Sequence, residues 1–320
     1  MSNIPEVDTA SPLFFVINAA SGRNDPDATR QVIEQTLLTN RRAGELLYAK
    51  PGDLANVARK GAALAGARRS AVVAVGGDGT INAVAQAAYV ENCPLGVVPQ
   101  GTYNYFARTH GIPTKAAGAV QALLNAAPVP VQVGLINDQV FLVNASVGLY
   151  PELLQDREAY KARFGRSRVV AFAAALATLL ARHRQLQLHI ERSSGARDVK
   201  TPTLFVGNNR LQLEQVGLRE APSLNDGCIA AVMLRPIGSF AMLGLLFRGA
   251  FGRLGEADTV ESFKFHRMIV TPRPSRNGRK VKVAFDGELS YLRAPLDFRV
   301  APKPLFLLKS GVIELGQGRV

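Results

Sequence analysis

Residues 71–82 have the sequence AVVAVGGDGTIN, and this stretch decides which fold the chain can adopt. Five consecutive apolar residues are typical of a strand that is buried on both faces of a sheet. The glycines that follow let backbone N–H groups approach an anion closely, and a helix starting after them turns its positive end toward that anion. The stretch therefore predicts a strand, a phosphate-binding turn and a helix, in that order.

Within this turn, Asp78 and Thr80 have the side chains that could take part in binding or catalysis. Thr80 can donate a hydroxyl hydrogen bond. The Asp78 carboxylate would repel phosphate unless a cation or a substrate proton is present, so it suits Mg²⁺ handling or proton transfer. The alternative is a tight turn in which Asp78 only caps the helix. Neither the Walker sequence nor the protein-kinase motif set occurs in the chain.

The first 130 residues repeat the order strand, polar turn, helix. Such repetition predicts a parallel sheet covered by helices, and ligands bind at the carboxyl edge of such sheets. Beyond residue 130, short β-prone runs separated by Asn, Asp, Gly and Pro turns predict an antiparallel β-sandwich. The predicted strands are 13–17, 71–75, 95–98, 129–135, 140–146, 186–191, 203–206, 228–234, 263–271, 280–285 and 298–300. Helices are expected at 27–42, 53–65 and 81–89, and interrupting helices at about 152–183 and 236–252.

The bulk properties restrict the partners. The chain has 38 Lys and Arg against 25 Asp and Glu, a formal charge of +13, which can attract nucleic acid, anionic lipid headgroups or nucleotides. Cys93 and Cys228 lie far apart, and the first ten residues have no basic segment, so we expect a cytoplasmic protein. The longest apolar run, 169–181, is shorter than the roughly 20 residues that a membrane span needs. We expect no transmembrane segment, and the sequence does not indicate an oligomeric state.

Four further motifs accompany GGDGT. They are NAASG at 18–22, PQGTYNYFA at 99–107, GNN at 207–209 followed by APSLNDG at 221–227, and DGE at 286–288. Together these motifs resemble the diacylglycerol kinase catalytic-domain family, which includes bacterial lipid kinases and sphingosine kinases. The GGDGT motif alone is shared with NAD kinases and phosphofructokinases.

The resemblance implies a fold and a domain division. We expect an N-terminal three-layer α/β domain of the NAD-kinase type and a C-terminal antiparallel β-sandwich domain. The first would comprise residues 1–130 plus about 301–320 and bind ATP, and the second would comprise 131–300 and take the lipid. ATP is expected in the cleft between them.

The resemblance also implies roles for individual residues. Glu288 would take the proton from the lipid hydroxyl, and Asp78 would act with a catalytic Mg²⁺ or share the acid–base work. Asp226 would hold a structural Mg²⁺ with backbone carbonyls near Ser223 and Cys228. The residues expected to contact the nucleotide are Asn18, Gly76, Gly77, Asp78, Gly79, Thr80, Ile81, Asn82, Gly101 and Thr102. Ala19 and Ala20 depart from the family's first turn, and Tyr48 stands where some relatives have Thr.

The expected function is ATP-dependent phosphorylation of a lipid hydroxyl, with diacylglycerol as the default acceptor. The expected partner is a lipid, and contact with an anionic membrane surface is an additional possibility. Three alternatives stay open: a kinase of the NAD-kinase type, a lipid-binding protein without turnover, and a nucleic-acid binder suggested by the charge alone. We expect no nucleic-acid partner, because the motifs indicate phosphoryl transfer.

Overall fold

The computed structural model describes residues 4–18, 26–149, 151, 185–215, 217, 222, 224, 227–235, 259–274 and 280–310. The chain divides into two compact units, Met1–Val131 with Lys303–Val320, and Gln132–Pro302. The helices expected at 152–183 and 236–252 lie outside the described residues. Among the described residues, no helix has the length and apolar character needed to cross a membrane.

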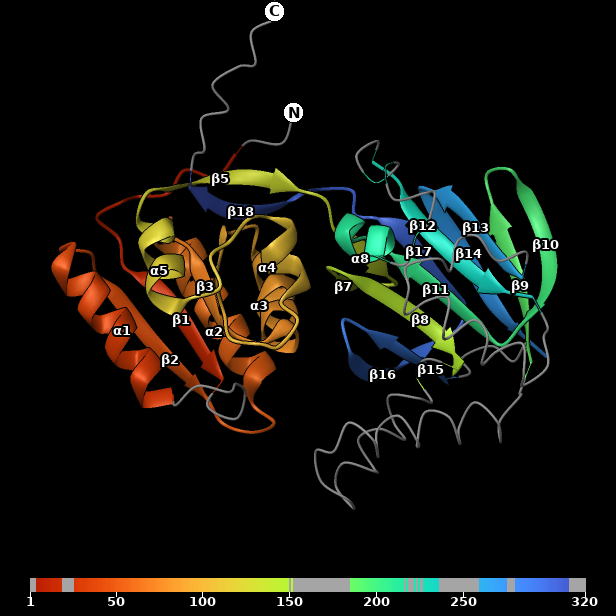
Figure 1. Ribbon diagram of the computed structural model, residues 1–320, viewed down its shortest axis with the longest axis horizontal. Coiled ribbons are helices and arrows are strands. Elements are labelled where there is room, and N and C mark those ends of the chain that lie inside the picture. The colour runs from red at the N-terminus through yellow and green to blue at the C-terminus, as the bar shows by residue number, and fades with distance from the viewer. Residues whose placement is uncertain are drawn as a thin grey trace, which may run out of the picture. The chain divides into compact units, whose positions relative to one another are not determined.

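The first unit is built on a six-stranded sheet with the order β2-β1-β3-β4-β18-β5 (Figure 1). Strands β1 to β4 run parallel, β18 is parallel to β4, and β5 is antiparallel to β18. The strands are β1 (Leu13–Asn18), β2 (Gly44–Ala49), β3 (Val72–Gly76), β4 (Leu95–Pro99), β5 (Ala126–Val131) and β18 (Leu305–Ser310). The helices are α1 (Pro26–Thr39), α2 (Leu54–Ala67), α3 (Asp78–Glu91), α4 (Tyr105–Thr109) and α5 (Ala116–Leu124).

Helices cover both faces of this sheet. On one face, Phe15 and Val73 pack in a buried cluster with Ile33 of α1 and Val120 of α5. On the other face, α2 lies so close that a Cβ on Gly61 would come within 2.9 Å of the Val16 side chain. The side chains of the buried strands alternate between the two faces of the sheet and pack against helices on each. The predicted three-layer α/β domain is therefore confirmed.

The second unit contains two six-stranded sheets, β10-β9-β14-β17-β6-β7 and β13-β12-β11-β8-β15-β16 (Figure 1). Neighbouring strands in both sheets are antiparallel, and the inward side chains of both sheets join in one buried cluster, so the predicted β-sandwich is confirmed. The strands are β6 (Gly134–Ile136), β7 (Gln139–Phe141), β8 (Asn144–Gly148), β9 (Leu186–Arg192), β10 (Gly195–Thr201), β11 (Thr203–Gly207), β12 (Ile229–Leu234), β13 (Val260–Phe265), β14 (Arg267–Arg273), β15 (Lys280–Phe285), β16 (Glu288–Arg293) and β17 (Leu296–Val300). A short helix, α8 (Arg210–Gln215), follows β11.

Three predicted strands are each two strands in the structure. The run 129–135 is divided between β5 of the first unit and β6 of the second, and 263–271 is divided at His266, where the chain passes from one sheet to the other. The run 140–146 breaks at Leu142 and Val143, whose N–H groups bind the Asp286 carboxylate. Strands β10 and β16 were not predicted, because both lie at sheet edges and have the mixed polarity that half-exposed edges permit.

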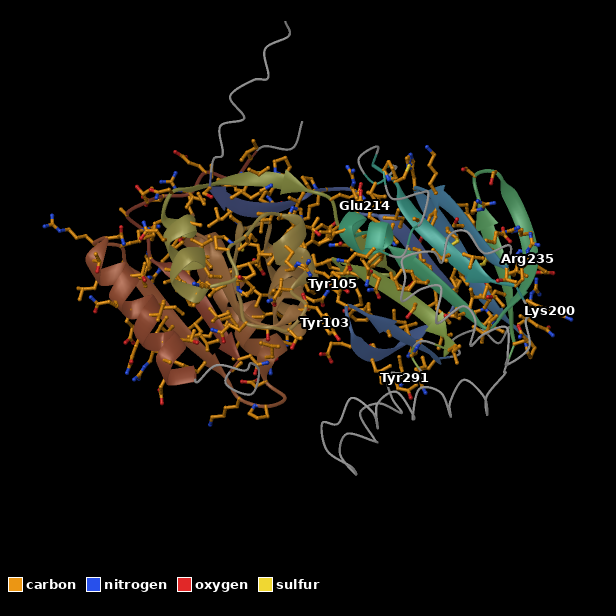
Figure 2. The ribbon with its side chains drawn as sticks, in the orientation of Figure 1. Tyr103, Tyr105, Lys200, Glu214, Arg235 and Tyr291 are labelled. Carbon is orange, nitrogen blue, oxygen red and sulfur yellow. The ribbon has the colours of Figure 1, made fainter. Side chains whose placement is uncertain are left out.

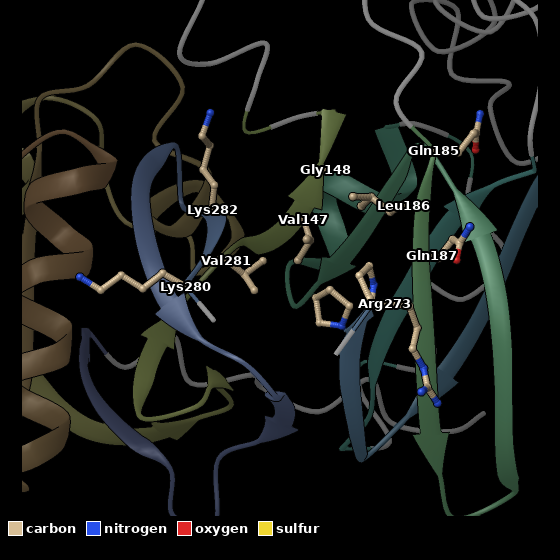
Figure 3. A pocket seen from close by; sticks show the side chains of 11 residues that line it. Val147, Gly148, Gln185, Leu186, Gln187, Arg273, Lys280, Val281 and Lys282 are labelled. Carbon is tan, nitrogen blue, oxygen red and sulfur yellow. The ribbon is translucent and has the colours of Figure 1, made fainter. Parts of the chain in front are cut away.

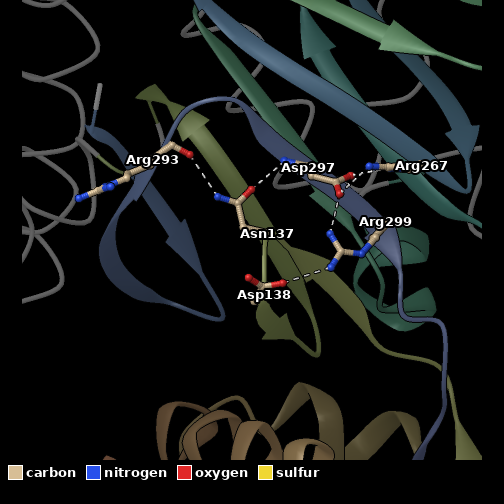
Figure 4. Close-up of polar contacts among 6 residues, drawn as sticks. All are labelled: Asn137, Asp138, Arg267, Arg293, Asp297 and Arg299. Atoms are coloured by element: carbon tan, nitrogen blue, oxygen red, sulfur yellow. Dashed lines mark hydrogen bonds and ion pairs between the residues drawn. The ribbon is translucent and has the colours of Figure 1, made fainter. Parts of the chain in front are cut away.

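An ion-pair network supports the turn between β6 and β7 (Figure 4). The Asn137 side chain donates to the Arg293 carbonyl (3.1 Å) and accepts from the Asp297 N–H (2.8 Å). The Asp297 carboxylate accepts two hydrogen bonds from Arg267 (3.0 and 3.1 Å) and one from Arg299 (2.6 Å). Both arginines form ion pairs with carboxylates, so their charges are already neutralised. This cluster therefore supports the structure and is not suited to bind an anion.

His110 makes the stability of the first unit depend on pH. Its ring packs edge-on against Phe106 (4.6 Å between ring centroids), and burial, together with the positive charge of Lys309, lowers the pKa of His110 from 6.5 to about 4. Between these values the unfolded chain binds a proton that the folded chain does not, so stability decreases as the pH falls from 6.5 toward 4. We expect the loss to reach roughly 2–3 kcal/mol, from about 1.4 kcal/mol per pKa unit.

The His110→Gln variant should lack this component of the pH dependence. Urea unfolding of both proteins between pH 4 and 7.5 measures the difference. Parallel pH profiles in the two proteins would contradict the assignment.

Candidate nucleotide and catalytic site

The turn after β3 is formed by Gly77, which adopts an extended conformation and caps α3. Helix α3 begins at Asp78, three residues before the predicted start, so Gly79 and Thr80 belong to its first turn. The first N–H groups of a helix have no partner within that helix and carry its positive end. The helix start therefore presents donors at the carboxyl edge of the sheet, where the phosphate-binding turn was predicted.

Gly76 allows the helix to return close to the end of its own strand. A Cβ at Gly76 would lie 2.5 Å from Thr80 Oγ1 and 2.7 Å from Thr80 Cβ, which no side chain tolerates. Thr80 is buried, and its hydroxyl oxygen accepts a hydrogen bond from Asn18 Nδ2 at the end of β1 (3.2 Å). The structure thus joins the ends of β1 and β3, which the sequence places about 60 residues apart.

The loop after β4 contacts the turn after β3. A Cβ at Gly101 would lie 3.0 Å from the Gly77 Cα, and the Gln100 N–H donates to the Gly76 carbonyl (2.8 Å). Asn104 shapes this loop: its Oδ1 accepts from the Gly101 N–H and its Nδ2 donates to the Gly101 carbonyl, both at 2.9 Å. The predicted residues Gly76, Gly77 and Gly101 therefore line one region.

Asp78 is held between these two loops. Its Oδ2 accepts a hydrogen bond from the Asn104 N–H (3.1 Å), whereas its Oδ1 is buried without a hydrogen-bond partner among the described residues. Burial raises the pKa of Asp78, and the backbone amides of Asn104 and Tyr105 oppose that rise. A buried carboxylate oxygen without a donor is suited to a cation or a shared proton. This observation fits a Mg²⁺ ligand beside the glycine-lined turn of Gly76, Gly77 and Gly101, which we call the cradle.

The other predicted nucleotide contacts differ in exposure. Ile81 and Asn82 are buried within α3, and Thr102 is exposed on the loop. Tyr103 and Tyr105 flank Asn104 and stack in parallel, with 5.8 Å between ring centroids and 8° between planes (Figure 2). The buried position of Ile81 makes it a packing residue, whereas Thr102 is accessible to a ligand.

In the second unit, Asp286 anchors the hairpin that carries Glu288. Its carboxylate accepts hydrogen bonds from three backbone N–H groups, those of Leu142 (2.7 Å), Val143 (2.8 Å) and Asn144 (3.0 Å). Asp286 and Gly287 both have positive φ, as a two-residue Asp-Gly hairpin turn requires. Glu288 follows as the first residue of β16 and is exposed. The turn thus presents a carboxylate to solvent from a fixed backbone.

The predicted structural metal site is described only in part. Ser223 and Asp226 lie outside the described residues. The Cys228 carbonyl accepts a hydrogen bond from Gln132 Nε2 (2.9 Å), which also donates to Asn208 Oδ1 (2.9 Å). Among the residues that the structure describes, no group of three His, Cys, Asp or Glu side chains could hold a metal ion.

A cavity of about 340 Å³ opens at one end of the β-sandwich (Figure 3). Val147, Leu186 and Val281 line it together with two prolines. Lys280 and Lys282 belong to the same strand as Val281, but their side chains point away from it (Figure 3). Gln185, Gln187 and Arg273 also line the cavity, so its wall combines apolar and polar residues.

Sequence reasoning missed the roles of Asn104 and Asp286. Asn104 adopts a left-handed conformation immediately before α4. Asn before a short helix, in a Gly-containing loop, was a signal for that conformation. From the sequence, Asp286 is an ordinary residue of a hairpin turn. Its neighbours in the sequence give no indication of the three backbone N–H partners, which lie more than 140 positions away.

Comparison with known proteins bears on this geometry. The sequence profile described as diacylglycerol kinase catalytic domain matches residues 12–136, the segment that contains the cradle. This match covers less than half of the chain.

Two curated relatives each match a part of this chain. A YegS-like probable lipid kinase from Pseudomonas putida is 38% identical over 120 residues, covering 37% of this chain and 39% of the relative. A diacylglycerol kinase from Bacillus subtilis is 42% identical over 88 residues, covering 27% and 29%. The chain spans about a third of the length of these relatives.

A solved structure extends the similarity of fold. A diacylglycerol kinase from Bacillus anthracis superposes with a TM-score of 0.68 over 97% of this chain and 98% of that one, at 19% identity. At this identity the match establishes the fold of both units and nothing about the acceptor.

Replacement of Gly76 tests the close approach in the cradle. We expect Gly76→Ala to lower the free energy of unfolding by about 1–3 kcal/mol, as forced overpacking does, and to weaken nucleotide binding. Gly66→Ala in α2 is the matched control, because its Cβ would meet nothing nearer than 3.9 Å, and it should be neutral or stabilising by up to about 1 kcal/mol. Urea unfolding and ATP titration calorimetry measure both effects. Equal behaviour of the two variants would argue against a tight cradle.

Replacement of Asp286 tests the hairpin anchor. Asn tolerates positive φ but has one acceptor oxygen, so Asp286→Asn places an amide group against at least one backbone N–H. We expect a loss of about 2–4 kcal/mol in the free energy of unfolding. Asp138→Asn, whose carboxylate is 95% exposed, should cost less than about 1 kcal/mol. Thermal unfolding followed by circular dichroism compares the two variants. If Asp286→Asn were as stable as the unsubstituted chain, the hydrogen bonds of the three backbone N–H groups would not need the negative charge of Asp286.

Proposed function

We propose that this chain transfers the γ-phosphoryl group of ATP to a hydroxyl group of a lipid, with diacylglycerol as the first candidate acceptor. The observation that carries the proposal is the glycine-lined cradle formed by Gly76, Gly77 and Gly101 at the start of α3, beside the buried Oδ1 of Asp78, which has no hydrogen-bond partner in the described part of the chain. The match of residues 12–136 to the diacylglycerol kinase catalytic domain supports the same reaction class.

The first unit would bind the nucleotide. Backbone N–H groups at Gly79 and Thr80, with the helix dipole behind them, favour phosphate. Gly76, Gly77 and Gly101 leave the space that Cβ atoms would fill. Asn18 holds the Thr80 hydroxyl, so both residues contribute to the wall of the cradle.

Mg²⁺ would be held by the Asp78 carboxylate and the nucleotide phosphates, and it would supply charge neutralisation during transfer. The Asn104 N–H fixes one oxygen of Asp78, which leaves the other directed to the ligand. Asp226 stays a proposed ligand for a second, structural ion.

The second unit would supply the base. Glu288 would accept the proton of the lipid hydroxyl as its oxygen forms a bond to the γ-phosphorus and the bond to the β-phosphate oxygen breaks. The Asp286 turn holds the backbone of Glu288 in a defined position. A general base must be held in this way to meet the reacting hydroxyl group in the right geometry.

Phosphorylation of a lipid panel with radiolabelled ATP tests the proposal. The panel should contain diacylglycerol, phosphatidylglycerol, sphingosine and ceramide, with NAD as a non-lipid acceptor. We expect a phosphorylated lipid product with the unsubstituted chain, and a loss of about a hundredfold or more in kcat for Glu288→Gln, as removal of a general base causes. Asp78→Asn should lower activity as strongly.

Glu214→Gln is a matched control for Glu288→Gln, because Glu214 is an exposed carboxylate of the same unit, paired with Arg210. It should keep full activity. Product with NAD alone would favour a kinase of the NAD-kinase type. ATP binding without product on any acceptor would favour a lipid-binding protein without turnover.

A further inference from the structure

One face of the β15–β16 hairpin combines cations with exposed apolar side chains. Along β15, Val281 and Val283 pack into the sandwich core, so Lys280 and Lys282 lie on the opposite face (Figure 3). Along β16, Leu292 packs inward, so Leu289, Tyr291 and Arg293 lie outward. We call this set the hairpin face; its members are Lys280, Lys282, Leu289, Tyr291 and Arg293.

The apolar members of the hairpin face are accessible. Tyr291 is 60% exposed (Figure 2). Leu289 is 38% exposed, and both belong to the few large apolar side chains in the described part of the chain that face solvent. Strand β16 is the last strand of its sheet, and no further strand pairs with its free edge within the described ranges. Exposed aromatic and aliphatic groups beside cations are typical of surfaces that enter the interface of a bilayer.

The register places two like charges opposite each other. Lys280 pairs with Arg293 across the strands, and Lys282 pairs with Tyr291. Directly opposed like charges destabilise a sheet. Neither Lys280 nor Arg293 forms an ion pair within the part of the chain that the structure describes. An anionic partner would relieve this repulsion.

We propose that the hairpin face docks on an anionic lipid bilayer, with its cations among the headgroups and Tyr291 and Leu289 in the interface. The proposal rests on the proposed function, because a lipid kinase must reach its acceptor at a bilayer. Glu288 lies directly before Leu289 at the turn end of β16, so docking of the hairpin face would hold the proposed base near the bilayer, with its side chain on the other face of the hairpin. A second copy of the chain fits this face poorly, because a twofold pairing of β16 edges would bring the same cations together.

Vesicle sedimentation with the full chain tests the docking in the absence of ATP. Vesicles of phosphatidylcholine alone are compared with vesicles that also contain phosphatidylglycerol. We expect binding to the anionic vesicles only, decreasing as salt is added. Phosphoryl transfer to a detergent-dispersed acceptor is measured in parallel, so that failure of the kinase proposal is seen separately from failure of docking.

Lys280→Glu separates docking from folding. It places a carboxylate opposite Arg293, so the melting temperature should stay the same or rise, while vesicle affinity should fall roughly tenfold or more, from about fivefold per cation. Lys200→Glu, an equal charge change at an exposed position on β10, is the control and should keep its affinity within about threefold. Tyr291→Ser should weaken binding, whereas Val90→Ser, at a 63% exposed position of α3, should not.

Equal losses in Lys280→Glu and Lys200→Glu would overturn the proposal, because they would show that net charge alone attracts the protein. Absence of binding by the unsubstituted chain would overturn it as well. In either case the cations on β16 and its neighbour serve only to protect an exposed sheet edge from aggregation.

Discussion

The close approach of two loops, those that follow β3 and β4, is the constraint on which the candidate site depends. Gly77 and Gly101 leave so little room between their backbones that no side chain could stand at Gly101. Asn104 joins the loops, because its side chain holds Gly101 and its N–H holds Asp78. The parallel sheet makes this possible by bringing the carboxyl ends of β3 and β4 to one edge. The carboxylate is thereby positioned beside the start of α3 before any ligand is present.

Two aspartates in similar sequence settings have different hydrogen-bond surroundings. Asp78 and Asp286 each precede a glycine after an apolar strand. Asp286 accepts three backbone hydrogen bonds and serves as a structural anchor. Asp78 has a buried oxygen that finds no hydrogen-bond partner within the described residues, and burial raises its pKa. An anchored carboxylate stabilises a turn, and an unsatisfied one is available to a metal ion or proton. The number of hydrogen-bond donors around each carboxylate, and not the sequence motif, distinguishes a structural aspartate from one that is available to a ligand.

The β15–β16 hairpin gives the second unit a role that goes beyond packing. Its inward side chains belong to the sandwich core, its turn is anchored by Asp286, and its outward side chains form the hairpin face. One hairpin thus carries the core, the proposed base and the proposed membrane contact. Because the strand period is two, the core contacts and the hairpin face lie on opposite sides of the hairpin, and Glu288 lies at its turn on the core-facing side.

The sequence by itself determined the α/β and β-sandwich classes, the turn at 76–80 and the resemblance to the diacylglycerol kinase catalytic domain, because buried strands, glycine turns and motifs are local patterns. Only the tertiary structure decided that the run 129–135 is divided between two units, that Asn104 binds Asp78, and that Asp286 collects three amides from 142–144. It also decided the Lys280–Arg293 register. These features depend on contacts between segments far apart along the chain, and local hydrophobic periodicity contains no information about which distant segment will supply the partner.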